Sequence, residues 1–79
     1  MSLVEVLAPS SGSVIELLVV AGDQVQEGQE VLIIESMKME IPVEAPATGI
    51  VLEVAVTETS PIDVGDVLMR IERNLNDRD

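Results

Sequence analysis

The chain has 79 residues, 47% of them hydrophobic, and a formal net charge of −11. This length allows one small domain with a single core. The absence of cysteine and histidine excludes disulfides, thiolate metal sites and the Cys–His and Ser–His–Asp catalytic groups, and it disfavours zinc. The acidic charge disfavours nucleic-acid binding, and every apolar run is too short to cross a membrane. We therefore expect no metal, no nucleic-acid partner and no membrane partner.

Short β-strands are predicted in chain order from β-branched residues that lie between turn signals. The predicted strands cover residues 13–20, 30–36, 49–56 and 66–72. Segments rich in Gly, Pro, Ser, Thr or Asp separate them, and helical periodicity is nearly absent. Many short strands at even spacing are typical of an all-β sandwich or closed barrel. We expect a domain over residues 1–72 and a polar C-terminal tail over residues 73–79.

The chain also repeats itself after 37 residues. Residues 6–35 align with residues 43–72 without a gap, and ten of the thirty aligned positions are identical. The identical pairs include Gly12/Gly49 and Gly28/Gly65, which we place at turns that need permissive backbone angles. Two copies are too few for a solenoid. The repeat predicts two intertwined halves related by a pseudo-two-fold axis.

The segment ESMKME, residues 35–40, joins the two halves and contains Lys38, the only lysine of the chain. Met37 and Lys38 are predicted at or near the tip of a β-hairpin, although two-residue hairpin loops favour Asn-Gly and related pairs. An exposed lysine amine is protonated at neutral pH and is a poor catalyst. It suits a site that a separate enzyme acylates once. The alternative is a solubilising turn lysine, with Met37 and Met39 packed on the end of the barrel.

ESMKME and the following APATGIV resemble the attachment site of biotinyl domains, the biotin carboxyl carrier modules of biotin-dependent carboxylases and decarboxylases. The similarity covers about residues 4–72. It implies covalent biotin on Lys38, with Met37 and Met39 recognised by the biotin ligase. It also implies a flattened eight-stranded antiparallel β-barrel or sandwich with quasi-two-fold symmetry and the lysine on a tight hairpin.

Some details of the sequence differ from the usual pattern of that family. Ser36 stands where alanine is commonest, and its small side chain is expected to fit. TETSP, residues 57–61, lacks the glycine of its counterpart, residues 20–24, which leaves the geometry of that loop open. The connections in the two halves are equally short, so the chain resembles family members without the "thumb" insertion near the biotin.

The resemblance implies a non-catalytic carrier of the acyl-CoA carboxylase type. Its implied partners are a biotin protein ligase, a biotin carboxylase and a carboxyltransferase, and we expect an isolated domain of this kind to be a monomer. The amino terminus lacks the pattern of a signal peptide, so the cytoplasm is the expected compartment.

Three other functions are compatible with parts of the pattern. A lipoyl-type carrier also modifies a hairpin lysine, but its sites typically read Asp-Lys-Ala, and MKM departs from this on both sides. An unmodified structural β module of an adaptor protein usually carries a long helical hairpin at this position, and the sequence has none. Glu35 and Glu40 flank the lysine and could act as a carboxylate pair, but no second functional group accompanies them.

Overall fold

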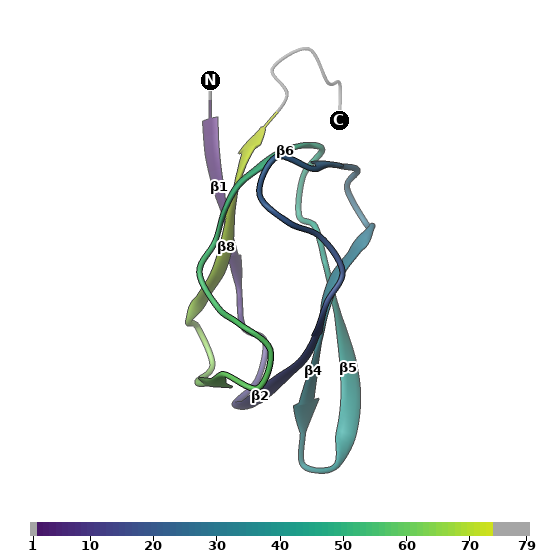
Figure 1. Ribbon diagram of the computed structural model, residues 1–79, viewed down its shortest axis with the longest axis vertical. Helices are drawn as coiled ribbons and strands as arrows, with labels where there is room; N and C mark the ends of the chain where they lie inside the picture. Colours follow the sequence, from purple (N-terminus) through teal and green to yellow (C-terminus); the bar gives the residue numbers. More distant parts are fainter. Residues whose placement is uncertain (1, 74–79) are drawn as a thin grey trace.

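A computed structural model describes residues 2–73, which form two antiparallel four-stranded sheets packed against each other (Figure 1). The strands are β1 Ser2–Leu7, β2 Gly12–Leu17, β3 Gln24–Val25, β4 Glu30–Ser36, β5 Met39–Glu44, β6 Gly49–Val54, β7 Pro61–Ile62 and β8 Val67–Arg73. The strand orders are β1-β8-β6-β3 and β5-β4-β2-β7. The predicted all-β fold is confirmed as a sandwich rather than a closed barrel. Of the predicted tail, Arg73 is the last residue of β8, and residues 74–79 lie outside the described residues.

The described part of the chain contains no helix that is long and apolar enough to span a membrane.

The pseudo-two-fold symmetry predicted from the repeat is present in the strand order. Adding 37 to the residue numbers converts β1 into β5, β2 into β6 and β3 into β7, and it relates β4 to β8 in the same way. Each sheet therefore contains two strands from each half of the chain. Neither half could complete a sheet alone, which is the intertwined arrangement that the repeat indicates.

Hydrogen bonds between the two halves follow the same symmetry. The Ala8 amide donates to the Asp66 carbonyl at 2.8 Å, and the Ala45 amide, 37 residues later, donates to the Gln29 carbonyl at 2.8 Å. Both bonds join one half of the chain to the other. Such pairing satisfies backbone groups that would otherwise be buried without a partner.

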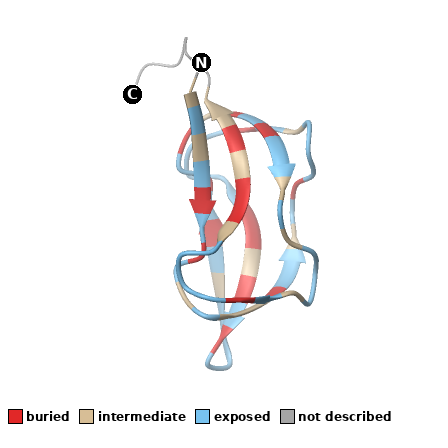
Figure 2. Ribbon diagram, turned by 90° about the vertical axis from the view of Figure 1, so that its left-hand side faces the viewer, coloured by how far each residue is buried: buried red, intermediate tan, exposed pale blue. Residues whose placement is uncertain are grey.

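The core lies between the sheets and contains no aromatic side chain, because the sequence has none. Figure 2 shows the buried positions alternating with exposed ones along several strands, as expected where one face of a sheet is covered. The largest fully buried side chains are Leu32, Ile34, Leu68, Met69, Ile71, Val14, Val25, Val31 and Val51. These branched and flexible side chains fill a thin sandwich without aromatic rings.

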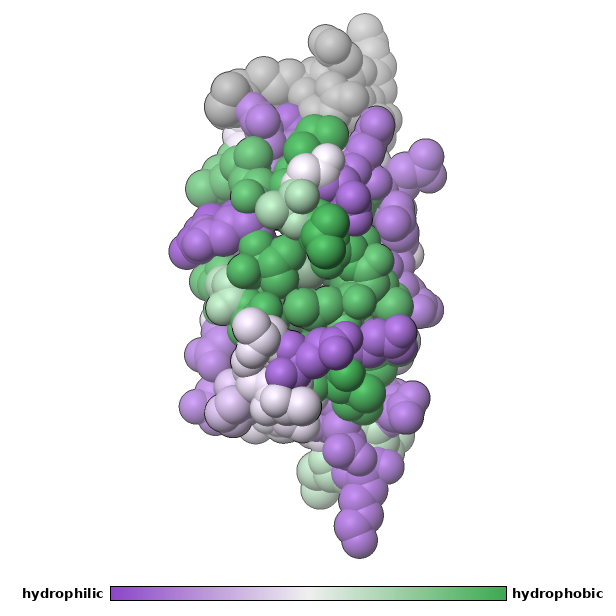
Figure 3. Space-filling view, in the orientation of Figure 1, coloured by the Kyte–Doolittle hydropathy of each residue, from purple (hydrophilic) through white to green (hydrophobic). Residues whose placement is uncertain are grey.

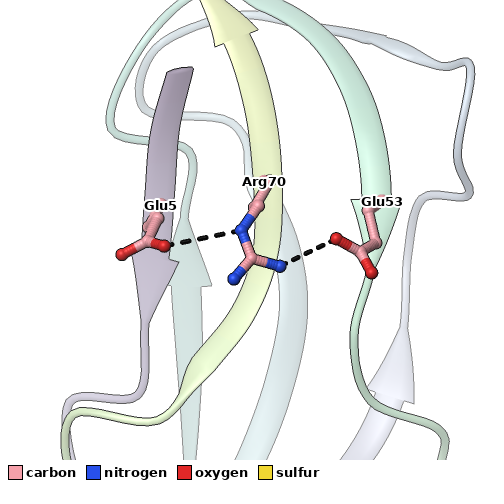
Figure 4. Close-up of polar contacts among 3 residues, drawn as sticks. All are labelled: Glu5, Glu53 and Arg70. Carbon is pink, nitrogen blue, oxygen red and sulfur yellow. Dashed lines mark hydrogen bonds and ion pairs between the residues drawn. The ribbon is translucent and has the colours of Figure 1, made fainter.

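The outer face of one sheet carries the ion pairs of Arg70. Its Nε lies 3.4 Å from Glu5 Oε2 in β1, and its Nη1 lies 2.7 Å from Glu53 Oε1 in β6 (Figure 4). All three side chains are partly exposed to solvent, so this network contributes at most about 1 kcal/mol. It joins the three neighbouring strands and offsets part of the strong negative charge of the chain.

The strands before the two long connections are shorter than predicted. β2 ends at Leu17 instead of residue 20, and β6 ends at Val54 instead of residue 56. In each connection a turn side chain accepts a backbone hydrogen bond: the Asp23 carboxylate from the Val20 amide at 2.9 Å, and the Ser60 hydroxyl from the Thr57 amide at 3.0 Å. These local bonds compete with strand pairing and end the ladders early.

Thr59 occupies the backbone conformation that its repeat partner Gly22 adopts. Their φ angles are 72° and 98°. The Thr59 amide donates to the Val14 carbonyl at 2.8 Å, and the Gly22 amide donates to the Val51 carbonyl at 2.7 Å. The loop without a glycine therefore keeps the geometry of its counterpart. A β-branched residue at positive φ is strained, however.

We predict that Thr59→Gly stabilises the domain. Glycine removes the strain of the left-handed conformation, but it also loses more chain entropy on folding. The net effect should be a rise in the free energy of unfolding of about 1 kcal/mol. Urea unfolding of the variant beside the wild type measures this difference. The matched change Gly22→Ala places a side chain at positive φ and should lower stability by a similar amount. A Thr59→Gly variant less stable than the wild type would contradict the assignment of strain.

Candidate functional site

The junction between the halves forms a β-hairpin with a two-residue loop. β4 ends at Ser36 and β5 begins at Met39, and these two residues face each other across the ladder. Met37 and Lys38 form the loop, with φ angles of 52° and 65°. The predicted position at the hairpin tip is confirmed. Positive φ at both loop positions is what type I′ turns require, and Asn-Gly or Asp-Gly would adopt it at lower cost than Met-Lys.

The side chains at the tip stand in solvent. Met37 is 92% exposed, Met39 is 65% exposed, and Lys38 is also exposed. The hairpin projects from the end of the sandwich, clear of the body of the molecule (Figures 1 and 3). The two methionines are therefore not packed on the end of the sandwich, and this removes the structural explanation of their presence.

Lys38 makes no hydrogen bond or ion pair with any other described residue. Glu35 and Glu40 lie opposite each other on the hairpin, one residue pair below the pair that closes the loop. Like charges facing each other across strands are unfavourable. The hairpin thus presents one exposed ammonium above two exposed carboxylates.

Gly12 supports the base of the hairpin through close packing of backbones. A Cβ atom at Gly12 would overlap the Glu35 carbonyl oxygen and lie 3.2 Å from the Ser36 Cα atom. Gly49 meets Glu72 in the same way in the other sheet. The prediction that Gly12 and Gly49 occupy turns is wrong, because both begin strands and neither has positive φ. Gly28 and Gly65, both with φ of 89°, do occupy turns.

Ser36 anchors the hairpin from below. Its side chain is only 6% exposed, and its hydroxyl lies 2.8 Å from that of Ser10 in the connection between β1 and β2. The small side chain fits, as expected. The bond to Ser10 could not be predicted from the sequence, since the two residues are 26 positions apart and no motif links them.

The two ends of the described chain lie away from the hairpin. Ser2 in β1 and Arg73 in β8 face each other in the ladder, in the position that corresponds by symmetry to Met39 and Ser36. They lie at the opposite end of the sandwich from the hairpin tip (Figure 1). Neither described end of the chain therefore lies beside the hairpin tip.

Known proteins are similar to this chain in both sequence and fold. The model of the biotin–lipoyl family, described as "Biotin-requiring enzyme", matches residues 4–71. A biotin/lipoyl attachment protein of Bacillus subtilis (strain 168) is 47% identical over 64 residues, which cover 81% of this chain and 88% of that protein. Pyruvate carboxylase of the same organism is 41% identical over 68 residues, which cover 86% of this chain but 6% of the carboxylase.

A solved structure of a single-chain, multi-domain long-chain acyl-CoA carboxylase has the same fold. It superposes with a TM-score of 0.85 at 26% identity over 92% of this chain and 7% of that one. The match thus corresponds to a small part of that large protein. Since the family model spans nearly all of the described residues and a small relative is similar along most of its own length, the chain belongs to the biotin–lipoyl attachment family.

Proposed function

We propose that the chain is a biotin carboxyl carrier in which Lys38 is the attachment point. The observation that carries the proposal is the hairpin tip: the only lysine of the chain is free, exposed, and set between two exposed methionines. This arrangement fits a covalently attached group, because nothing in the described residues covers the amine or competes for it.

Attachment would convert the Lys38 amine into an amide. A biotin protein ligase would supply biotinyl adenylate: the Lys38 ammonium first loses one proton, the neutral nitrogen then bonds to the acyl carbon, and AMP leaves as the nitrogen loses a second proton. The chain becomes more negative by one charge. When bound, biotin supplies a ureido ring that carries a carboxyl group, while the protein contributes binding and orientation.

The dimensions of the domain indicate how biotin would reach the active sites of two enzymes. The extended lysine and biotin together span roughly 14 Å, whereas the molecule is 39 Å long. The arm alone is too short to join well-separated sites, so the whole body would move between a biotin carboxylase and a carboxyltransferase. A compact sandwich with the hairpin at one end suits such movement, and tethering would raise the effective concentration at each site.

We also propose that the chain acts as a carrier and is not an enzyme by itself. The described residues include no group of three or more His, Cys, Asp or Glu side chains arranged to hold a metal ion. Catalysis is proposed to reside in the partners. The net charge of −11 opposes contact between two copies and favours partner surfaces that are positively charged, so we propose a monomer that docks on basic surfaces.

Transfer of label from bicarbonate tests the carrier role. The purified chain, first biotinylated by a biotin protein ligase, is incubated with a biotin carboxylase, ATP and radioactive bicarbonate, and protein-bound label is measured. We expect label on the biotinylated chain and none on the unmodified chain or on Lys38→Arg. A biotinylated chain that takes up no label from any of several biotin carboxylases would contradict the carboxyl carrier role.

A further inference from the structure

The side chains that oxidants attack most readily are concentrated at the hairpin. The sequence has no cysteine, tryptophan, tyrosine or histidine, and it has four methionines. Met69 is fully buried in the core, whereas Met37 and Met39 are 92% and 65% exposed. Met1 lies outside the described residues. Within residues 2–73 the two accessible thioethers are therefore the two residues that flank Lys38.

We propose that Met37 and Met39 form a peroxide-sensitive modification site that controls the attachment of biotin to Lys38. This inference rests on the proposed function, because it concerns the reaction of the same lysine with the ligase. The oxidant is hydrogen peroxide or another peroxide. Each thioether sulfur accepts one oxygen atom and loses two electrons, and hydrogen peroxide is reduced to water.

The reaction is reversible by enzymes. Methionine sulfoxide reductases return the sulfoxide to the thioether, and two thiols are oxidised to a disulfide as one water leaves. Two reductases are needed, one for each sulfoxide epimer. The site can thus pass repeatedly between two states.

Oxidation at the tip changes recognition without disturbing the fold. A thioether offers a soft, flexible apolar surface, and a sulfoxide is polar and chiral. Both methionine side chains are largely exposed to solvent, so their new oxygen atoms enter no core and break no described hydrogen bond. Oxidation of Met69, by contrast, would place a polar group among fully buried side chains. The hairpin sites therefore alter what a ligase contacts while the domain stays folded.

A simple scavenging role is the competing explanation, since exposed methionines can consume oxidant without further effect. The two explanations differ in the rate of biotinylation after oxidation. Scavenging leaves that rate unchanged. Control of attachment lowers it, because the modified side chains adjoin the reacting amine on both sides.

The oxidation itself can be mapped because cleavage after glutamate separates the hairpin pair of methionines from Met1 and Met69. The expected fragments 1–5, 36–40 and 59–72 contain Met1, the hairpin pair and Met69 respectively. The unmodified chain is treated with hydrogen peroxide, the peroxide is removed with catalase, and the fragments are analysed by mass spectrometry. We expect oxygen on fragment 36–40 well before fragment 59–72. Equal oxidation rates for the two fragments would overturn the proposed selectivity.

The functional test compares initial rates of biotinylation by a biotin protein ligase. The oxidised chain, shown by circular dichroism to be folded, should react roughly five- to tenfold more slowly than the untreated chain. Treatment with both sulfoxide reductases and a thiol should restore the rate. The matched control Met37→Leu/Met39→Leu keeps apolar side chains without sulfur, and its rate should not respond to peroxide.

The possible outcomes separate this inference from the proposed function. If the untreated chain accepts biotin and the oxidised hairpin accepts it equally fast, the inference is overturned and the proposed function stands. If the untreated chain accepts no biotin, the proposed function fails and the inference fails with it. A slower reaction that the reductases reverse supports the inference, even if the leucine variant is itself a poor substrate.

Discussion

Gly12→Ala should lower the free energy of unfolding by about 3 kcal/mol, at the upper end of the effects expected for overpacking. The added Cβ would overlap the Glu35 carbonyl oxygen, which belongs to the backbone and cannot rotate away as a side chain could. β2 would have to separate from β4 at the base of the hairpin. A domain of this size has only a few kcal/mol of stability, so a substantial fraction of the variant should be unfolded at room temperature. Urea unfolding and circular dichroism measure the effect.

Gly49→Ala is the matched control for this change. Its Cβ would overlap the Glu72 carbonyl oxygen in the other sheet, so the loss of stability should be similar. The two variants should differ at the hairpin. At a low temperature where both are folded, biotinylation should slow with Gly12→Ala and not with Gly49→Ala. A Gly12→Ala variant as stable as the wild type would show that the strands can separate at little cost.

Met37→Asp with Met39→Ala should lower the rate of biotinylation by roughly tenfold or more, because both soft apolar contacts beside Lys38 are lost. The new carboxylate also adds negative charge above Glu35 and Glu40, which already face each other. The variant places lysine in the Asp-Lys-Ala context, so acceptance of lipoate from a lipoate ligase should increase. In this account the methionines favour the biotin ligase and also disfavour the lipoate ligase, so the choice of ligase depends on unfavourable as well as favourable contacts.

Stability should not fall in this variant, and this separates recognition from folding. Met37 has a φ of 52°, a conformation that aspartate tolerates better than methionine. Intact-mass analysis after incubation with each ligase measures the modification, and urea unfolding measures the stability. Met37→Leu/Met39→Leu, which preserves apolar side chains, is the control. Unchanged biotin labelling of the Asp/Ala variant would refute the recognition role of the methionines.

The repeat made the symmetry of the fold predictable. A shift of 37 residues aligns apolar positions and turn glycines, and in the structure it also relates hydrogen bonds such as those of Ala8 and Ala45. The place of Lys38 at the hairpin tip followed, because the linking segment had to reverse the chain between two strands. The family resemblance rested on the same residues.

Other features could not be predicted because they depend on contacts distant in sequence. Gly12 is needed for the close approach of β4, and a sequence does not show which strand will lie beside a glycine. Thr59 adopts positive φ because its turn is fixed by hydrogen bonds from both halves, against the preference of the residue itself. The pair Ser10 and Ser36 likewise meets only after the sheets have formed.

The charge at the hairpin connects the proposed modification to docking. Biotinylation would remove the positive charge of Lys38 and leave Glu35 and Glu40 facing each other beneath the tip. The modified hairpin would therefore carry more net negative charge than the unmodified one. A basic partner surface would distinguish the two states by electrostatics as well as by the biotin itself.

Intact-mass measurement after incubation with biotin, ATP and a biotin protein ligase tests the assignment of Lys38 most directly. Lys38 is the only lysine of the chain, so Lys38→Arg keeps the charge and removes the only side-chain amine. A second variant, Lys38→Met with Met39→Lys, keeps the composition and moves the amine from the loop into β5. We predict one biotinyl group on the wild type, none on Lys38→Arg and strongly reduced labelling of the exchanged variant. A biotinyl group that persists on Lys38→Arg, or a wild-type chain that acquires none, would contradict the assignment.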